Sequence, residues 1–293
     1  MSTLKIKRFN PQQLKPDRIC LFVGKRGTGK STLLRDIMYH MRGYIDVPTA
    51  MTPTEDSAEM FESCMPASCV HRDFHEGTVD RIIAHQRKAA KKKKEPRHVL
   101  LVLDDMGFDK KVLKGKNMRD LFMNGRHYSV TLCLTLQYCI DMGPDLRSQI
   151  DYCFCLREPI ISNRCKLWKY FFGGFSHFQD FCSVFDTCTA NNECLVIDNT
   201  IKSNNLADFI FYYKASIDIP SFRLGMPQIW KLHSRFYYTE EEIEELEEAL
   251  TTHPSAQLRL KIKLLCVKYH PDHGQTMLSS AEVARDLIEL LSD

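Results

Sequence analysis

The chain has 293 residues, a formal charge of +3 and 44% hydrophobic residues. This length and composition suit one large core, or a core beside a small second domain, and exclude a mainly disordered chain. The small net charge does not indicate a polyanionic partner, so a nucleic-acid surface would need local clusters of lysine and arginine. The amino terminus lacks the apolar region of a signal peptide, and no apolar run approaches the roughly 20 residues of a membrane span. We therefore expect a soluble protein.

Twelve cysteines are present, and none forms a C-x-x-C pair. Four of them interrupt apolar, strand-like runs, where cysteine acts as a small hydrophobic residue: Cys20, Cys133, Cys153 and Cys155. The usual spacing of zinc ligands is missing. The cysteines therefore indicate a reducing compartment rather than a disulfide framework.

The first predicted elements are a strand, a glycine-rich turn and a helix. Residues 19–23 (ICLFV) form an apolar run, and apolar residues recur at helical spacing over 33–41. Between them, Gly24-x-x-x-x-Gly29-Lys30-Ser31 has the Walker A form. This order of elements is the one that a phosphate-binding loop requires.

The loop predicts a site for ATP with Mg²⁺. Its glycines let backbone amides turn toward phosphate oxygens, Lys30 supplies a positive charge to the β and γ phosphates, and Ser31 offers a hydroxyl to Mg²⁺. The predicted nucleotide-binding residues are Gly24, Lys25, Arg26, Gly27, Thr28, Gly29, Lys30, Ser31 and Thr32.

A second buried strand, HVLLVLDD over 98–105, ends in adjacent carboxylates and resembles a Walker B segment. We expect Asp104 to hold Mg²⁺ and Asp105 to orient or deprotonate the attacking water. The alternative is that the two acids only end a strand and cap a helix. Residues 104–107 also fit the D-x-x-G of GTPases, but no N-K-x-D follows to recognise guanine.

A third strand, over 130–137, ends in Gln137, which we expect to contact the γ-phosphate or the attacking water. The alternative is a polar residue that merely leaves the strand. Arg126 and Arg147 are candidates to neutralise charge in the transition state, in the same or a neighbouring subunit, although either could simply pair with an acid.

Further runs complete a predicted α/β fold with a mainly parallel sheet. Strands are expected over 152–158, 193–198 and 208–213, and helices over 78–94, 117–126 and 163–172. Strand signals stop after Pro220, and the acidic segment 239–250 begins a helical tail. We expect a P-loop ATPase domain over 1–220 and a helical region over 221–293.

Taken together, five segments in this order resemble the genome-packaging ATPases of nucleocytoplasmic large DNA viruses, the poxvirus-type members of the FtsK-HerA group. They are GKRGTGKST, MTPTED, LLVLDDMG, NGRHYSVTLCLTLQY and DLRSQIDYCFCLRE. The resemblance implies a RecA-like additional-strand core that assembles into a ring, usually a hexamer. Such a ring pumps double-stranded DNA into a preformed capsid, which places the protein at viral assembly sites in the host cytoplasm, with virion association as an option.

The resemblance also implies roles for single residues. Lys30 and Ser31 match the Walker A pair, Asp104 the metal acid, Asp105 the catalytic acid and Gln137 the polar sensor. Arg147 is the candidate finger from a neighbouring subunit by analogy. Cellular relatives commonly carry Glu at the position of Asp105, so the base here is one methylene shorter.

Two further segments suggest partners. The basic run Arg87, Lys88, Lys91, Lys92, Lys93 and Lys94 could contact DNA phosphates or could be a solvated helix end. In the tail, LRLKIKLLCVKYHPDHG resembles part of a J-domain, with His270, Pro271 and Asp272 in the loop that stimulates a chaperone ATPase. An ordinary helix-ending turn explains the same tripeptide.

The sequence thus favours an ATP-driven DNA translocase that packages a viral genome. A small-molecule P-loop kinase and a chaperone-recruiting scaffold remain as alternatives.

Overall fold

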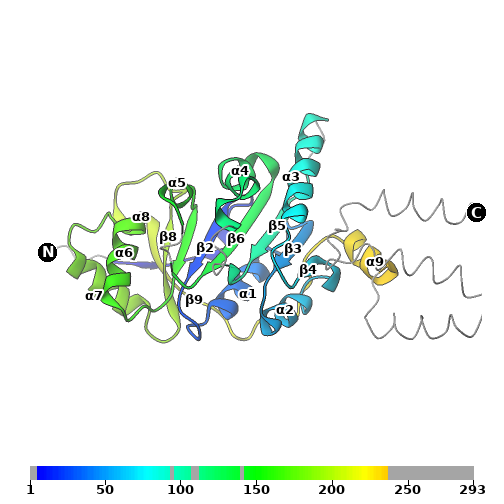
Figure 1. Cartoon of the computed structure of the whole chain (residues 1–293). Coiled ribbons are helices and arrows are strands. Elements are labelled where there is room, and N and C mark those ends of the chain that lie inside the picture. The colour runs from blue at the N-terminus through cyan, green and yellow to red at the C-terminus, as the bar shows by residue number, and fades with distance from the viewer. Residues whose placement is uncertain (1–4, 93–95, 107–111, 139–141, 237–293) are drawn as a thin grey trace, which may run out of the picture.

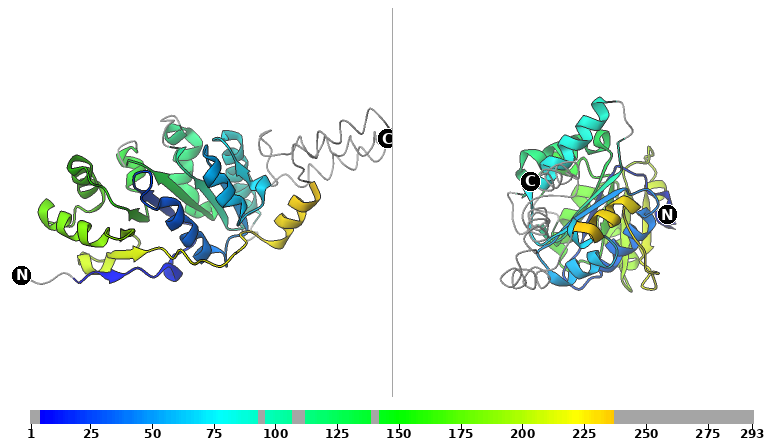
Figure 2. Two further views of the ribbon diagram at one scale, coloured as in Figure 1. Left: turned by 90° about the horizontal axis from the view of Figure 1, so that it is seen from below. Right: turned by 90° about the vertical axis from the view of Figure 1, so that its right-hand side faces the viewer.

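The computed structural model describes residues 5–92, 96–106, 112–138 and 142–236. A sheet of nine strands runs through this part of the chain, and helices cover both of its faces, with α1 and α2 on one side and α3 and α4 on the other (Figure 1, Figure 2). The strands are β1 (Lys7–Arg8), β2 (Ile19–Val23), β3 (Val47–Met51), β4 (Val70–His71), β5 (Val99–Leu103), β6 (Val130–Leu136), β7 (Tyr152–Cys155), β8 (Glu193–Asp198) and β9 (Ile210–Lys214).

Nine α-helices lie within the described residues. They are α1 (Lys30–Met41), α2 (Glu55–Glu62), α3 (Glu76–Lys91), α4 (Lys116–Asn124), α5 (Pro144–Arg147), α6 (Ile161–Phe171), α7 (Phe178–Cys188), α8 (Leu206–Phe209) and α9 (Pro227–Phe236). Short 3-10 turns include η2 (Ala67–Cys69) and η5 (Gly125–Tyr128).

The strand order is β1-β9-β8-β7-β2-β6-β5-β3-β4, and most neighbouring strands are parallel. Strand β8 pairs antiparallel with both β7 and β9. The central strands β2, β5 and β6 are buried along their whole length, as expected of parallel strands that are covered on two faces. The predicted fold class is therefore confirmed, and β6 is the strand inserted between β2 and β5.

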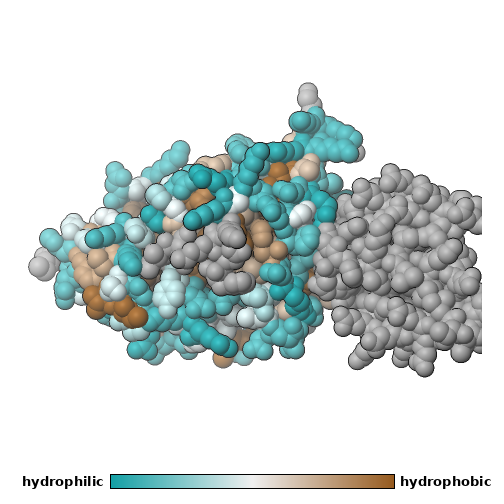
Figure 3. Space-filling model, viewed as in Figure 1, coloured by the Kyte–Doolittle hydropathy of each residue, from teal (hydrophilic) through white to brown (hydrophobic). Residues whose placement is uncertain are grey.

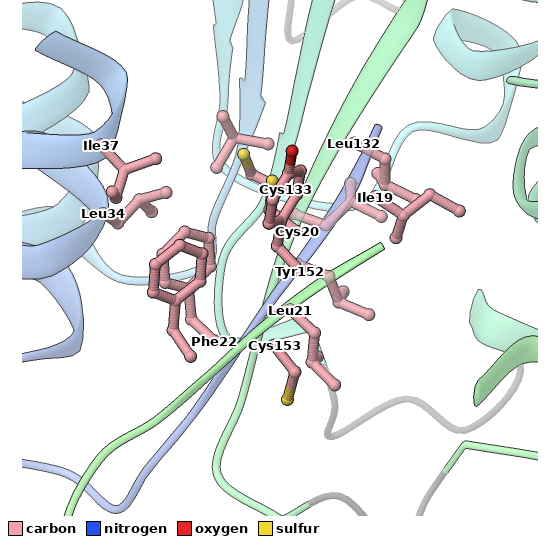
Figure 4. Packing of buried hydrophobic residues seen from close by; sticks show 14 of the residues in the cluster. Ile19, Cys20, Leu21, Phe22, Leu34, Ile37, Leu132, Cys133, Tyr152 and Cys153 are labelled. Carbon is pink, nitrogen blue, oxygen red and sulfur yellow. The ribbon is translucent and has the colours of Figure 1, made fainter. Parts of the chain in front are cut away.

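The core forms where helix α1 packs on this sheet. Figure 4 shows Leu34 and Ile37 of α1 facing Phe22 of β2, and the Phe22 ring stacks on that of Phe154 with centroids 4.9 Å apart. Two cysteines, Cys20 and Cys133, are completely buried on neighbouring strands. The hydrogen bond to Cys133 and burial raise the pKa of the Cys20 thiol, so it stays protonated as a small core residue.

The polypeptide that follows β9 returns to the far end of the sheet. Phe222, Leu224 and Ile229 are buried, and the Leu224 amide donates to the Cys64 carbonyl at 2.7 Å. The described part of the predicted helical region, which includes α9, thus packs against the sheet domain. The predicted boundary near residue 220 stays a prediction, and the J-like segment with His270, Pro271 and Asp272 lies outside the described residues.

Several elements were not expected from the sequence, among them β3, α2 and α7. Strand β3 contains Pro48, which is unusual inside a sheet because proline cannot donate a ladder hydrogen bond. Helix α2 is short, and helix α7 carries an aromatic face with Phe181 and Phe185 fully buried. Among the described helices, none is long and apolar enough to cross a bilayer.

Candidate nucleotide-hydrolysis site

The glycine-rich turn lies at the carboxyl end of β2, directly before α1. Gly27 and Gly29 have φ values of 77° and 92°, a region that favours glycine. Gly24 is required for a different reason: a Cβ there would lie 2.7 Å from Thr28 Oγ1 and 2.9 Å from Leu156 Cβ. The loop is therefore drawn into a tight turn against the chain that leaves β7.

Lys30 is the first residue of α1, and its side chain reaches back into the loop. Its Nζ donates to the Gly24 carbonyl at 2.6 Å and to the Lys25 carbonyl at 3.3 Å. Burial lowers the pKa of Lys30, while Asp105 and Asp104 act to raise it. Both carboxylates are therefore close enough to the loop for their charges to act on the Lys30 ammonium.

The start of α1 provides donors for an anion. Its N-cap residue is Gly29, which has no side chain to cap the first turn. The amides of that turn are left for another acceptor, at the positive end of the helix dipole. A glycine-rich turn with a lysine inside it and uncapped amides beside it fits a triphosphate.

Asp104 follows β5 and is almost completely buried, with 4% of its surface exposed. Thr135 Oγ1 donates to its Oδ1 at 2.7 Å, and Thr52 Oγ1 donates to its Oδ2 at 3.4 Å. These hydroxyls come from β6 and from the end of β3, the two strands that flank β5. The Asp104 carboxylate is thus held in one orientation by both neighbouring strands.

Asp105 takes a left-handed backbone conformation, with φ at 53°. Its amide donates to Thr135 Oγ1 at 2.9 Å, so one hydroxyl joins the two acids. Gln137 Nε2 lies 3.1 Å from both Asp105 carboxylate oxygens. The structure therefore brings Asp104, Asp105 and Gln137 together at one edge of the sheet, and Gln137 contacts the acid directly.

The residues at this edge also fit Mg²⁺, an ion that prefers oxygen ligands and is commonly held by one or two carboxylates together with water and phosphate oxygens. Ser31 in the first turn of α1 and Asp104 at the end of β5 are the side chains that would hold it. Among the described residues, no cluster of three His, Cys, Asp or Glu side chains forms a metal site. Asp104 and Ser31 supply one carboxylate and one hydroxyl, and a bound nucleotide would supply phosphate oxygens.

Several residues that support the site were not found from the sequence. Glu158 is buried and its carboxylate lies 3.3 Å from Lys25 Nζ, which ties the loop to the segment after β7. Thr52 and Thr135 were missed because a threonine at the end of a strand carries no signal that distinguishes it from an ordinary β-former. Leu156, which packs on Gly24, was missed because a leucine that follows a strand has the same sequence signal as any other core residue.

The two candidate arginines lie elsewhere. The Arg147 guanidinium stacks over the Tyr170 ring at 3.8 Å and donates to the Met142 carbonyl. Arg126 lies in η5, directly before the amino end of β6, whereas Gln137 follows the carboxyl end of that strand. Arg126 therefore lies at the opposite edge of the sheet from Asp104 and Asp105, where its charge acts on the Asp151 carboxylate.

The basic run occupies the end of α3, the long helix that projects beyond the sheet (Figure 1). Arg87 is fixed there by Asp120, with Nη2 and Oδ2 2.7 Å apart. Lys88, Lys91 and Lys92 are exposed, and Figure 3 shows this end of the helix as hydrophilic. Lys93 and Lys94 lie outside the described residues. The described lysines precede β5, so they lie at the edge of the sheet opposite to the loop.

Comparisons with known proteins identify viral relatives of the chain. The family model for the Poxvirus A32 protein matches residues 6–211. Uncharacterized protein L437 of Acanthamoeba polyphaga mimivirus is 28% identical over 281 residues, which cover 91% of this chain and 98% of that protein. Uncharacterized protein 075L of Invertebrate iridescent virus 6 is 31% identical over 66% of this chain and 75% of its own length.

A solved structure shares the fold. It is the genome packaging NTPase B204 from Sulfolobus turreted icosahedral virus 2 in complex with AMPPCP, with a TM-score of 0.51 and 17% identity over 69% of this chain and 100% of that one. The predicted fold is confirmed by this structure, and the predicted poxvirus-type family is confirmed by the family model. The match to the family model covers most of the chain, and the chain belongs to the poxvirus A32 protein family.

Proposed function

We propose that this protein hydrolyses ATP to move double-stranded DNA into a viral capsid. The observation that carries the proposal is the meeting of Asp104, Asp105 and Gln137 beside the lysine of the phosphate loop. The family supports a viral role, and a protein of the same fold is described as a genome packaging NTPase.

In this proposal each residue has a separate task. Lys30 and the amides of the first turn of α1 bind the triphosphate. Ser31 and Asp104 would hold Mg²⁺, which would neutralise charge on the phosphates. Asp105 accepts the proton of the attacking water. Gln137 holds the Asp105 carboxylate by two hydrogen bonds of 3.1 Å and so determines where the base points. Each Asp105 oxygen keeps a second acceptor site, so the attacking water can donate to the carboxylate beside the Gln137 amide.

Assembly into a ring, with a hexamer as the expected form, would add groups that one chain lacks. Arg147 stays our candidate for the finger that reaches a neighbouring subunit, and leaving its own chain would require it to give up the stacking on Tyr170. The exposed lysines at the end of α3 are candidates for DNA phosphate contacts. We place the protein at viral assembly sites in the host cytoplasm.

The test is ATP hydrolysis by the full chain, measured with and without duplex DNA over a range of salt and protein concentrations. We expect DNA to raise turnover, the increase to fade as salt rises, and activity per chain to rise with protein concentration. Lys30→Ala is the control for the loop. If turnover does not change when DNA is added, the proposed DNA-translocating activity is wrong. If the protein instead phosphorylates a small acceptor stoichiometrically, it is a kinase.

A further inference from the structure

A second cavity adjoins the phosphate loop on the side away from the paired acids. It has a volume of about 580 Å³, within the range of small-molecule sites. Gly27 and Thr28 of the loop form one wall. The other walls come from Arg157, which follows β7, and from the turn between α7 and β8, with Asn191 and Asn192.

The sheet gives the bound triphosphate a direction. The acids end β5 and Gln137 ends β6, so the reacting γ-phosphate belongs on the β6 side of β2. The cavity lies on the other side, where β7 pairs with β2 and β8 follows β7. A triphosphate that extends through the loop from the acids therefore ends with its nucleoside at this cavity.

The side chains in the cavity have the chemistry to bind a nucleoside. Arg157 is exposed, and a planar guanidinium can stack on a base. The side-chain amides of Asn191 and Asn192 each offer donors and an acceptor to a base edge or to ribose hydroxyls. Asp186 also lines the cavity, but Arg164 holds both of its oxygens, at 2.9 and 2.6 Å. This carboxylate is engaged and is not the group that reads the base.

The turn itself can be altered without strain. Asn191 and Asn192 have φ values of 54° and 60°, which glycine adopts freely. The backbone bond that closes the turn, from the Glu193 amide to the Ala190 carbonyl at 3.0 Å, does not depend on either side chain. Replacing both asparagines by glycine therefore removes two amides while keeping the turn.

We propose that this cavity is the nucleoside subsite, in which Arg157, Asn191 and Asn192 bind the base and ribose of the nucleoside triphosphate. The proposal rests on the proposed function, because it takes the phosphate loop as the site of the triphosphate. It adds residues from two segments that no phosphate motif contains: Arg157 after β7, and Asn191 and Asn192 between α7 and β8.

The test compares ATP with inorganic tripolyphosphate, which carries the phosphates without the nucleoside. Binding of each to the full chain is measured by calorimetry in Mg²⁺ for the wild type, for Arg157→Gln and for the double variant Asn191→Gly with Asn192→Gly. We expect ATP affinity to fall at least about tenfold in each variant, and tripolyphosphate affinity to stay unchanged. Ser129→Gly is the matched control, since Ser129 also has a positive φ, of 52°, and lies at the other edge of the sheet.

The possible outcomes separate this inference from the proposed function. The nucleoside subsite is wrong if both cavity variants bind ATP and tripolyphosphate as tightly as the wild type does. That result would leave the proposed phosphate site unaffected. Equal losses for ATP and tripolyphosphate would also overturn the nucleoside subsite, because the residues would then act on the phosphates. A wild-type chain that binds neither compound would overturn the proposed function itself.

Discussion

The hydroxyl of Thr135 bonds to both acids, and removing it provides the sharpest test of the site. Thr135 is completely buried in β6, donates to Asp104 Oδ1 at 2.7 Å and accepts from the Asp105 amide at 2.9 Å. Thr135→Val keeps the shape of the side chain and removes both bonds. A bond to a carboxylate contributes about 1.5–3 kcal/mol, and a buried amide left without a partner costs about 1–3 kcal/mol.

Because both bonds share one hydroxyl and the site can relax, we expect Thr135→Val to lower the free energy of unfolding by about 2–4 kcal/mol. This is well within the roughly 5–15 kcal/mol of a typical domain, so the variant should fold. Urea unfolding without nucleotide measures the loss. ATP hydrolysis should fall as well, since the Asp105 backbone loses its anchor, and Thr135→Ser should restore most of both properties.

Thr131 supplies a matched control on the same strand. It is also completely buried, but its hydroxyl accepts from the Asp17 amide at 2.9 Å, at the other end of β6. Thr131→Val should destabilise the fold by about 1–2 kcal/mol and leave hydrolysis per folded molecule unchanged. If the free energy of unfolding of Thr135→Val lies within about 0.5 kcal/mol of the wild-type value, the Thr135 hydroxyl does not hold the two acids. A change of that size is typical of neutral surface substitutions.

Further predictions concern the residues around the phosphates. Lys30→Ala should abolish hydrolysis and leave the far-ultraviolet circular dichroism spectrum unchanged; residual full activity would remove the loop from the mechanism. Asp105→Asn should lower turnover by about 100-fold or more and preserve ATP affinity, and a parallel loss of affinity would argue against its role as the base. Gln137→Leu removes two bonds to a carboxylate and should lower turnover by roughly 10- to 100-fold, whereas faster hydrolysis would make Gln137 a restraint on the base. Burial lowers the pKa of Lys30, so as pH rises its charge is lost at a lower pH than that of an ordinary lysine. Tripolyphosphate affinity should decline in that alkaline range, and Lys30→Arg should remove the decline.

Much of the fold could be predicted from local patterns. The run ICLFV became β2, and the segments that end in Asp104 and Gln137 became β5 and β6. Such continuous apolar runs indicate inner strands in an α/β protein, because a strand buried on two faces needs apolar residues throughout. Strand β3 was not predicted, and its Pro48 is unusual in an inner strand. Strand β4 was not predicted because it has only two residues.

The phosphate loop was determined by the sequence itself, since its glycines, Lys30 and Ser31 are neighbours in the chain and their roles follow from local geometry. The surroundings of the acids were decided by tertiary structure alone. Only the insertion of β6 between β2 and β5 places Gln137 on Asp105 and the Thr135 hydroxyl between the two acids. Thr52 reaches Asp104 from a third strand, across 52 positions of sequence. A buried hydroxyl has the same local signature wherever it lies, so its partner is known only when the strands are ordered in space.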